Sequence, residues 1–140
     1  MTLNRTVRSP AIIPFQLLGD DLKTIEFSKQ VTPLEGYTDV TIHGSPDSFG
    51  IKTNKEWTNV THRDLANYLS KQGIRRNKIR LLSCSTGSSV CGVGQNLANK
   101  LGVEVLAPSD ILWIDKLGKL TIGRSPGQNT GSWVLFKPGH

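Results

Sequence analysis

Apolar residues in the middle of the chain follow two patterns, one typical of strands and one typical of helices, and these patterns take turns along the sequence. The first strand pattern is Tyr37–His43, which is rich in β-branched residues. A second strand pattern, Lys78–Cys84, leads into a run of small residues. Between the two strands, Leu65 and Leu69 recur at helical spacing and predict a helix over residues 62–72.

Capping residues support this helix and predict a second one. Thr61 is suited to the N-cap position because Asp64 follows three residues later, and Gly73 is suited to the C-terminal end. A further apolar stripe predicts a helix over Cys91–Leu101, and Val103–Ala107 is then a third strand. The order is β-α-β-α-β, and right-handed crossovers make such strands parallel.

Shorter strand patterns surround this unit. We therefore predict an α/β fold with a parallel-cored sheet, flanking helices and a C-terminal β-hairpin. The additional short strands are expected at Lys23–Phe27, Phe49–Lys52, Ile111–Ile114, Lys119–Ile122 and Trp133–Phe136.

Length and composition fit one domain. The chain has 140 residues, 36% of them apolar, which is enough for one modest core. Residues 1–20 contain Pro10 and Pro14 and no clear periodicity, so we interpret them as a leader or edge segment. Residues 21–140 form the single predicted domain. No stretch approaches the ~20 apolar residues of a membrane span, and we expect delivery as one module of a longer secreted protein.

The charge is basic, with 17 Lys and Arg against 11 Asp and Glu and a net charge of +6. This favours acidic partners, but aromatic residues are few and no nucleic-acid motif is present, so nucleic acid is not the expected ligand. We interpret the basic cluster at residues 75–80 as the solvated entry to a strand. Cys84 and Cys91 lack other ligands at metal-binding spacing, so no metal site is predicted. Cys91 is expected to begin or pack the second helix, and His62 to be exposed.

His43 and Cys84 are the residues best placed for chemistry. Each ends a strand, and the two strands are expected to be parallel neighbours whose ends meet at one edge of the sheet. Taken singly, such a Cys is a small buried hydrophobe and such a His satisfies a turn. Together they suggest a thiol nucleophile activated by an imidazole, with backbone N–H groups holding a developing oxyanion.

Other polar residues near the same edge are weaker candidates. Ser45 follows the first strand, and Ser109, Asp110 and Trp113 follow the third, where a substrate would bind. A Ser-Asp pair after a proline also serves as a turn or cap. Asp47 either orients His43 or faces solvent in a turn.

These residues carry a resemblance to a known family. Asp39–Gly44 and Ile79–Ser85, an apolar strand ending in His-Gly and another ending in Cys, resemble the caspase-like (clostripain-type) cysteine peptidases. Within that group they are most similar to the self-processing cysteine protease domains of large bacterial toxins. Gly94–Val103 extends the resemblance, which spans roughly residues 37–123.

The resemblance implies a catalytic dyad, His43 and Cys84, with the backbone N–H groups of Gly44 and Cys84 as the oxyanion hole. It also implies an inositol phosphate activator bound by a hairpin and basic residues; here Lys116, Lys119 and Arg124 fall in a similar place. The chain further resembles the C-terminal toxic domains of bacterial polymorphic toxins. In that setting the partners are a protein substrate in the target cell and a cognate immunity protein.

The function expected is therefore a toxin or effector domain acting as a cysteine peptidase. Three alternatives stay open. The same thiol and imidazole could perform deamidation or another protein modification. The chain could be a toxin of another class, such as a nuclease or an NAD-consuming enzyme, or a catalytically silent binding module.

Overall fold

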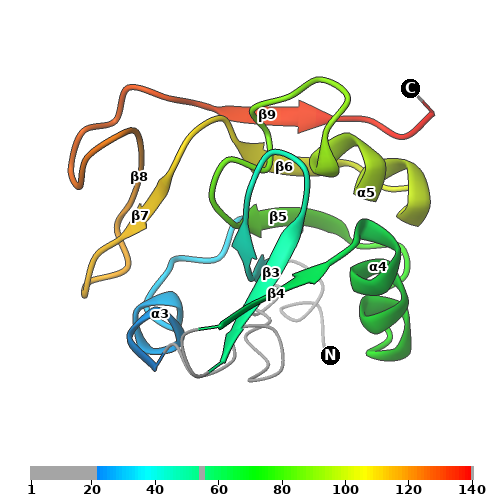
Figure 1. Cartoon of the computed structure of the whole chain (residues 1–140), viewed down its shortest axis with the longest axis horizontal. Helices are drawn as coiled ribbons and strands as arrows, with labels where there is room; N and C mark the ends of the chain where they lie inside the picture. Colours follow the sequence, from blue (N-terminus) through cyan, green and yellow to red (C-terminus); the bar gives the residue numbers. More distant parts are fainter. Residues whose placement is uncertain (1–21, 54–55, 140) are drawn as a thin grey trace.

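A computed structural model describes residues 22–53 and 56–139. The predicted leader, residues 1–20, lies outside the described residues. The main sheet has the strand order β1-β5-β6-β9 (Figure 1). Its strands are β1 (Tyr37–Thr41), β5 (Lys78–Leu82), β6 (Val105–Pro108) and β9 (Trp133–Phe136).

The parallel centre of the predicted sheet is confirmed, and further strands lie between β1 and the first crossover helix. β1 pairs in parallel with β5, and β5 with β6, whereas β9 runs antiparallel to β6. The crossovers are α4 (His62–Lys71) and α5 (Val93–Leu101). The protein is thus a mixed α/β fold built on a sheet with a parallel centre.

α4 begins with the predicted capping box, and a glycine ends α5. The Thr61 hydroxyl accepts a hydrogen bond from the Asp64 amide at 3.1 Å, and the Asp64 carboxylate accepts one from the Thr61 amide at 3.4 Å. Gly102 follows α5 in the left-handed conformation, with φ of 70°, which glycine adopts without steric cost. Cys91 lies before α5 and is exposed, so it neither begins nor packs that helix.

The two faces of the main sheet are covered by different elements. α4 and α5 lie together on one face, while α3 (Leu22–Ser28) and the hairpin lie on the other (Figure 1). Side chains alternate along each strand, so neighbouring residues of β5 enter different cores. Ile79 and Leu81 join the larger core with the α4 and α5 leucines, whereas Leu82 packs with Leu112 and Ile122.

α3 is a helix where the sequence predicted a strand over Lys23–Phe27, so that prediction was wrong. Ile25 and Ser28 are its buried residues, at the i, i+3 spacing of one helical face. A segment of seven residues is too short for its apolar pattern to distinguish a helix from a strand. No helix in the described part of the chain is long and apolar enough to cross a membrane.

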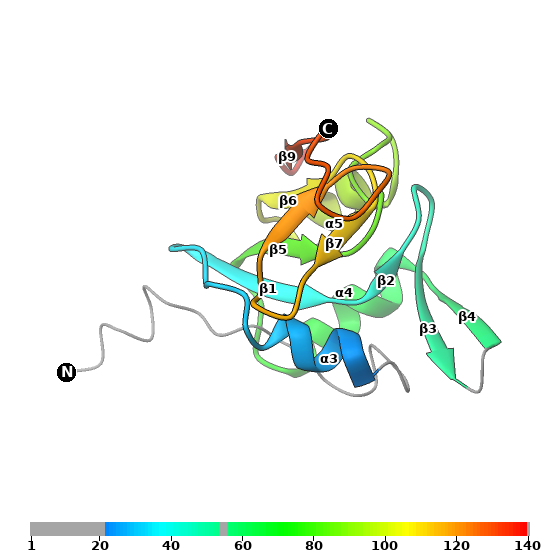
Figure 2. The same cartoon turned by 90° about the vertical axis from the view of Figure 1, so that its left-hand side faces the viewer.

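A second, three-stranded antiparallel sheet follows β1 directly. Its order is β2-β3-β4, with β2 at His43–Gly44, β3 at Phe49–Thr53 and β4 at Glu56–Val60. Figure 2 shows β3 and β4 standing out from the body of the molecule. The sequence prediction missed β4 because four of its five residues are exposed, so no apolar pattern marks it.

The predicted C-terminal hairpin consists of β7 (Leu112–Ile114) and β8 (Leu120–Ile122), which pair antiparallel as a separate two-stranded sheet. Lys116 is exposed in its connection. The hairpin does not join the main sheet, whereas β9 pairs with β6 and forms an edge strand of it.

The basic cluster before β5 is solvated only in part. Arg75, Arg76 and Lys78 are exposed, but Arg80 is 8% exposed. The Arg80 guanidinium donates to both carboxylate oxygens of Asp39, each at 2.6 Å, and to the Thr32 carbonyl at 3.0 Å. The interpretation of Arg80 as a solvated residue was therefore wrong, because a carboxylate on the adjacent strand allows its burial.

Candidate functional site

The register of β1 and β5 brings His43 and Cys84 to the same place. Thr41 lies opposite Leu82, and the Ile42 amide donates to the Leu82 carbonyl at 3.3 Å, which extends the ladder by one step. One residue further on each strand are His43 and Cys84, at the sequence separation of 41 that also relates Asp39 to Arg80. Alternation then directs both side chains to the face covered by α3 and the hairpin.

The backbones of the two strand ends touch at Gly44. A Cβ atom there would collide with the Ser83 hydroxyl and lie 2.6 Å from the Thr86 methyl and 2.9 Å from the Cys84 carbonyl oxygen. Real Cβ atoms do not approach other atoms so closely, so only glycine fits. The lack of a side chain at Gly44 therefore allows the His43 and Cys84 segments to lie in contact.

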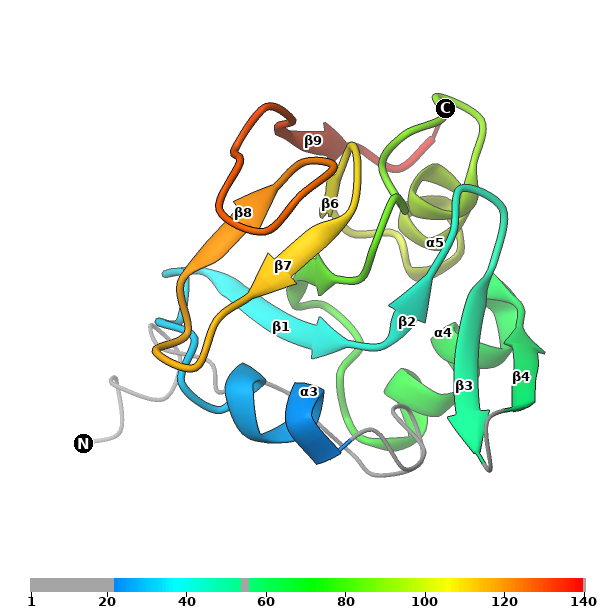
Figure 3. The ribbon, with the colours of Figure 1, turned by 60° about the vertical axis from the view of Figure 1, so that its left-hand side comes forward.

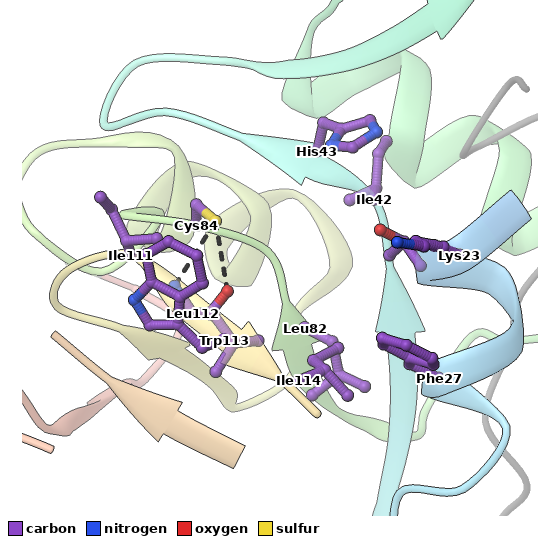
Figure 4. Close-up of a pocket in the computed structure, with 11 residues that line it drawn as sticks. Lys23, Phe27, Ile42, His43, Leu82, Cys84, Ile111, Leu112, Trp113 and Ile114 are labelled. Carbon is purple, nitrogen blue, oxygen red and sulfur yellow. Dashed lines mark hydrogen bonds between the residues drawn. The ribbon is translucent and has the colours of Figure 1, made fainter. Parts of the chain in front are cut away.

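Both predicted catalytic residues line one cavity of about 420 Å³. Figure 3 shows β1 running between α3 and β7, and both of these elements contribute residues to the lining of the cavity. Its lining is mostly apolar, as the close-up in Figure 4 shows. The lining residues come from α3, the two strand ends and β7: Lys23, Thr24, Phe27, Ile42, His43, Leu82, Cys84, Ile111, Leu112, Trp113 and Ile114.

The Cys84 thiol is held by β7. Its Sγ accepts a hydrogen bond from the Leu112 amide at 3.4 Å and donates to the Leu112 carbonyl at 3.7 Å. In Figure 4 the dashed lines from the sulfur run to Leu112 and not to His43. Burial raises the pKa of Cys84, and the negative charge of Asp110 raises it further. Hydrogen bonds from the backbone of Leu112 and of Cys84 itself lower the pKa by a smaller amount. The resting thiol is therefore protonated at neutral pH.

His43 is half-buried and sits at the start of the second sheet. Its imidazole faces the Trp57 indole, with 6.1 Å between ring centroids and 49° between ring planes. The imidazole thus has the cavity on one side and an aromatic ring of the β3–β4 hairpin on another.

A fixed turn follows Cys84. Ser85 has φ of 59°, a left-handed conformation that is uncommon outside glycine, and its amide donates to the Asp110 carbonyl at 3.0 Å. The Thr86 hydroxyl donates to the Ser83 carbonyl at 3.0 Å, and the Gly87 amide to the Pro108 carbonyl at 2.8 Å. Strain of this kind persists only where surrounding bonds hold it, and here they fix the backbone beside the thiol.

The predicted substrate-binding residues divide into two groups. Trp113 lines the cavity, and its indole donates to the Gly123 carbonyl at 2.8 Å. Ser109 instead accepts from the Ser132 amide at 3.0 Å and tethers the segment before β9. Asp110 caps its own loop, accepting from the Ile111 amide at 2.8 Å, and acts on the site through its charge.

Ser45 closes the turn between β2 and β3. Its hydroxyl donates to the Ser48 carbonyl at 3.1 Å and accepts from the Ser48 amide at 3.1 Å. Asp47 is exposed in the same turn, where its amide donates to Ser45, so it is a turn residue rather than a group that orients His43. Neither Ser45 nor Asp47 lines the cavity.

The remaining candidates lie away from the thiol. His62 is half-buried rather than exposed, and burial followed by the charges of Arg63 and Lys100 lowers its pKa. Of the residues proposed for an inositol phosphate, Lys119 lines a second cavity of about 200 Å³ beside Trp113, and Arg124 lies 3.9 Å from Asp110. Among the described residues, no cluster of three or more His, Cys, Asp or Glu could hold a metal ion.

Sequence reasoning missed the contribution of α3. Lys23, Thr24 and Phe27 form one wall of the cavity, but a segment expected to be a strand gave no reason to place them there. It also missed Leu112, because a backbone amide and carbonyl act on the thiol and any residue type supplies those groups.

Comparison with known proteins places the chain in one family. No curated protein and no solved structure matches it. A family model matches residues 14–122, which include every residue that lines the larger cavity. The chain therefore belongs to the family described as a domain of unknown function, DUF8616.

Proposed function

We propose that this domain is a caspase-like cysteine peptidase in which Cys84 is the nucleophile and His43 the base. One observation carries the proposal: a thiol and an imidazole that follow adjacent parallel strands, in matching register, line the same cavity. Nucleophilic catalysis by cysteine requires this pair of groups near one reacting carbonyl.

The proposed reaction uses these groups in sequence. His43 takes the proton from the Cys84 thiol, and the thiolate attacks the substrate carbonyl to form a C–S bond. The amides of Gly44 and Cys84 hold the resulting oxyanion. His43 then gives its proton to the departing amine as the C–N bond breaks, and water attacks the thioester to release the acid and restore the thiol.

Before this reaction, the thiol has to leave its hydrogen bonds with Leu112. These bonds are long, and sulfur is a weak donor and acceptor, so little free energy opposes the change. The raised pKa of Cys84 means that the imidazole is needed as a base, because burial disfavours a free thiolate. The proposed mechanism is therefore general-base catalysis rather than attack by a preformed thiolate.

The cavity also favours a type of substrate. Phe27, Leu82 and Trp113 make its wall apolar, and a volume of about 420 Å³ accommodates a large side chain. We expect an apolar residue of a protein substrate to enter it beside the bond that is cleaved. In the proposed setting, the domain is delivered as part of a larger secreted bacterial toxin, and a cognate immunity protein covers this cavity in the producing cell.

Expression in sensitive cells tests the proposal. Wild-type protein is compared with Cys84→Ala and His43→Ala, and new protein N-termini are identified by mass spectrometry. We expect toxicity and new termini with the wild type and neither with the two variants. Cys91→Ala is the matched control, since this exposed cysteine lies outside the cavity and its loss should change nothing.

Three other results would overturn the peptidase proposal, each in a different way. Toxicity that needs both residues but produces no new termini, with mass shifts at glutamine instead, would identify a deamidase. Toxicity that survives Cys84→Ala would indicate another class of toxin. Wild-type protein that is folded but changes no cellular protein would indicate a binding module.

A further inference from the structure

The second sheet presents one face on which His43 and the exposed Trp57 meet. His43 lies opposite Gly50, and Gly50 lies opposite Asn59, so these three positions form one row across β2, β3 and β4. Directly opposed residues of an antiparallel pair project to the same side of the sheet. Trp57 is two residues from Asn59 on β4 and therefore lies on that same face.

The missing side chain at Gly50 leaves a gap in this row, and the Trp57 indole fills it. A Cβ atom at Gly50 would collide with the Cζ2 and Cε2 atoms of the indole and lie 2.6 Å from its Cη2 atom. The ring thus lies directly on the Gly50 backbone. In this position the indole lies beside the His43 imidazole, with 6.1 Å between the two ring centroids.

A hydrogen bond fixes the rotation of the indole. Trp57 Nε1 donates to Asn59 Oδ1 at 2.6 Å, so the ring is held by its polar edge as well as by contact with Gly50. The side chain is nevertheless 43% exposed, which is unusual for a tryptophan that is fixed in two ways. Burial in the core therefore does not explain its orientation; Gly50 and Asn59 hold the ring beside His43.

We propose that Trp57 is a positioning residue for His43: its indole, seated on Gly50 and anchored by Asn59, holds the imidazole at the cavity that contains Cys84. This inference rests on the proposed function, since it assumes that His43 serves as the base. The need for such support follows from the backbone, because His43 begins a strand of only two residues. Displacement of a catalytic group by about 1 Å costs up to ~100-fold in rate.

The test is a double-mutant cycle on the alkylation of Cys84 by iodoacetamide at neutral pH. Peptide mass spectrometry follows Cys84 and Cys91 separately, so the exposed Cys91 serves as an internal reference in every sample. We expect Trp57→Ala to slow Cys84 alkylation about tenfold with His43 present and to have no further effect in the His43→Ala background. Trp57→Phe, which keeps an aromatic ring, should restore most of the rate.

Two further variants separate positioning from general damage. Gly50→Ala keeps the indole but displaces it from its seat, and should slow Cys84 alkylation as Trp57→Ala does. Thr58→Ala is the control, because Thr58 is exposed on the same strand but on the opposite face, opposite Ile51. It should alter neither the rate nor the thermal midpoint.

The outcomes distinguish this inference from the proposed function. If His43→Ala slows alkylation but Trp57→Ala does not, the positioning role is wrong and the dyad stands. Equal slowing by Trp57→Ala with and without His43 would also overturn the positioning role, since the indole would then act by another route. If His43→Ala itself leaves Cys84 alkylation unchanged, the dyad fails and the positioning role fails with it.

Discussion

Asp39 lies directly opposite Arg80 in the β1–β5 ladder, and its carboxylate accepts two hydrogen bonds from the guanidinium on the face of the sheet that also carries the cavity. Asp39 is 1% exposed, and the Arg80 guanidinium lies 5.9 Å from the centre of the Trp133 ring. This pair fixes the register of the two strands that bear His43 and Cys84, since a shift by one residue would leave both charges buried without a partner.

Loss of one member of this pair should be costly for stability. We expect Asp39→Ala to lower the free energy of unfolding by about 3–5 kcal/mol, because Arg80 would remain buried without its counter-charge. Urea denaturation measures the effect. The double variant Asp39→Leu/Arg80→Met, which has no buried charge, should regain much of the loss; equal or greater instability in the double variant would refute a role for the charge itself.

A methyl group at Gly44 should harm activity more than stability. Gly44→Ala places its Cβ against Ser83, Thr86 and the Cys84 carbonyl, so the two strand ends have to separate. Overpacking of this kind costs about 1–3 kcal/mol. We expect a folded protein, shown by its circular dichroism, that has lost cleavage activity, because the Gly44 and Cys84 amides proposed to hold the oxyanion would move apart. Gly73→Ala, at a glycine after α4 that has open space around it but a left-handed φ of 86°, should lower stability yet keep activity.

The reaction of Cys84 with iodoacetamide should depend on pH in a way that reveals its base. Burial raises the pKa of the thiol, so in the His43→Ala variant the thiolate forms only above the usual thiol pKa of about 8.5. Its alkylation should therefore be slow at pH 7 and still rise above pH 9. In the wild type, His43 accepts the proton, and Cys84 should already react faster than Cys91 at pH 7. Identical pH profiles for wild type and His43→Ala would refute the dyad.

The cavity wall supplied by α3 should control substrate choice rather than the chemical step. Phe27→Ala removes an aromatic ring from the wall and leaves His43 and Cys84 in place. We expect KM for peptides with a large apolar residue at the cleaved bond to rise about tenfold, with kcat little changed. Steady-state kinetics on a peptide series would show this, and a fall in kcat at constant KM would contradict it.

The N-cap of α4 offers a change that affects stability alone. Thr61→Ala removes the hydroxyl that accepts from the Asp64 amide and should cost about 1 kcal/mol. Thr61 is exposed and does not line the cavity, so cleavage and Cys84 alkylation should be unaffected. Thermal unfolding and a parallel activity assay provide the measurement, and a fall in activity without a fall in stability would contradict this separation.

The parts of the fold that were predictable are those in which local signals agree. α4 has an apolar stripe, a capping box and a terminal glycine, and it forms as the sequence indicates. The neighbouring positions of His43 and Cys84 followed from the right-handed crossover, which depends on chain topology and not on side-chain detail. For these elements a single sequence is sufficient.

What could not be predicted depends on contacts between distant residues. Arg80 is buried because Asp39 lies opposite it on the adjacent strand. No residue near Arg80 in the sequence indicates this pairing. α3 folds as a helix because Ile25 packs inward at that site, a tertiary effect that outweighs a weak local pattern. The hydrogen bonds from Leu112 to the thiol use backbone groups, which leave no trace in the residue type.

The hairpin that holds the thiol is also among the last parts of the domain to be synthesised. A nascent chain that has emerged as far as β6 contains both His43 and Cys84 but not Leu112. In such a chain β1, β5 and β6 can pair and the two crossover helices can pack on them while the sulfur is still uncovered. Docking of β7 is then the event that completes the cavity, so a chain that has emerged only as far as residue 111 would expose the thiol.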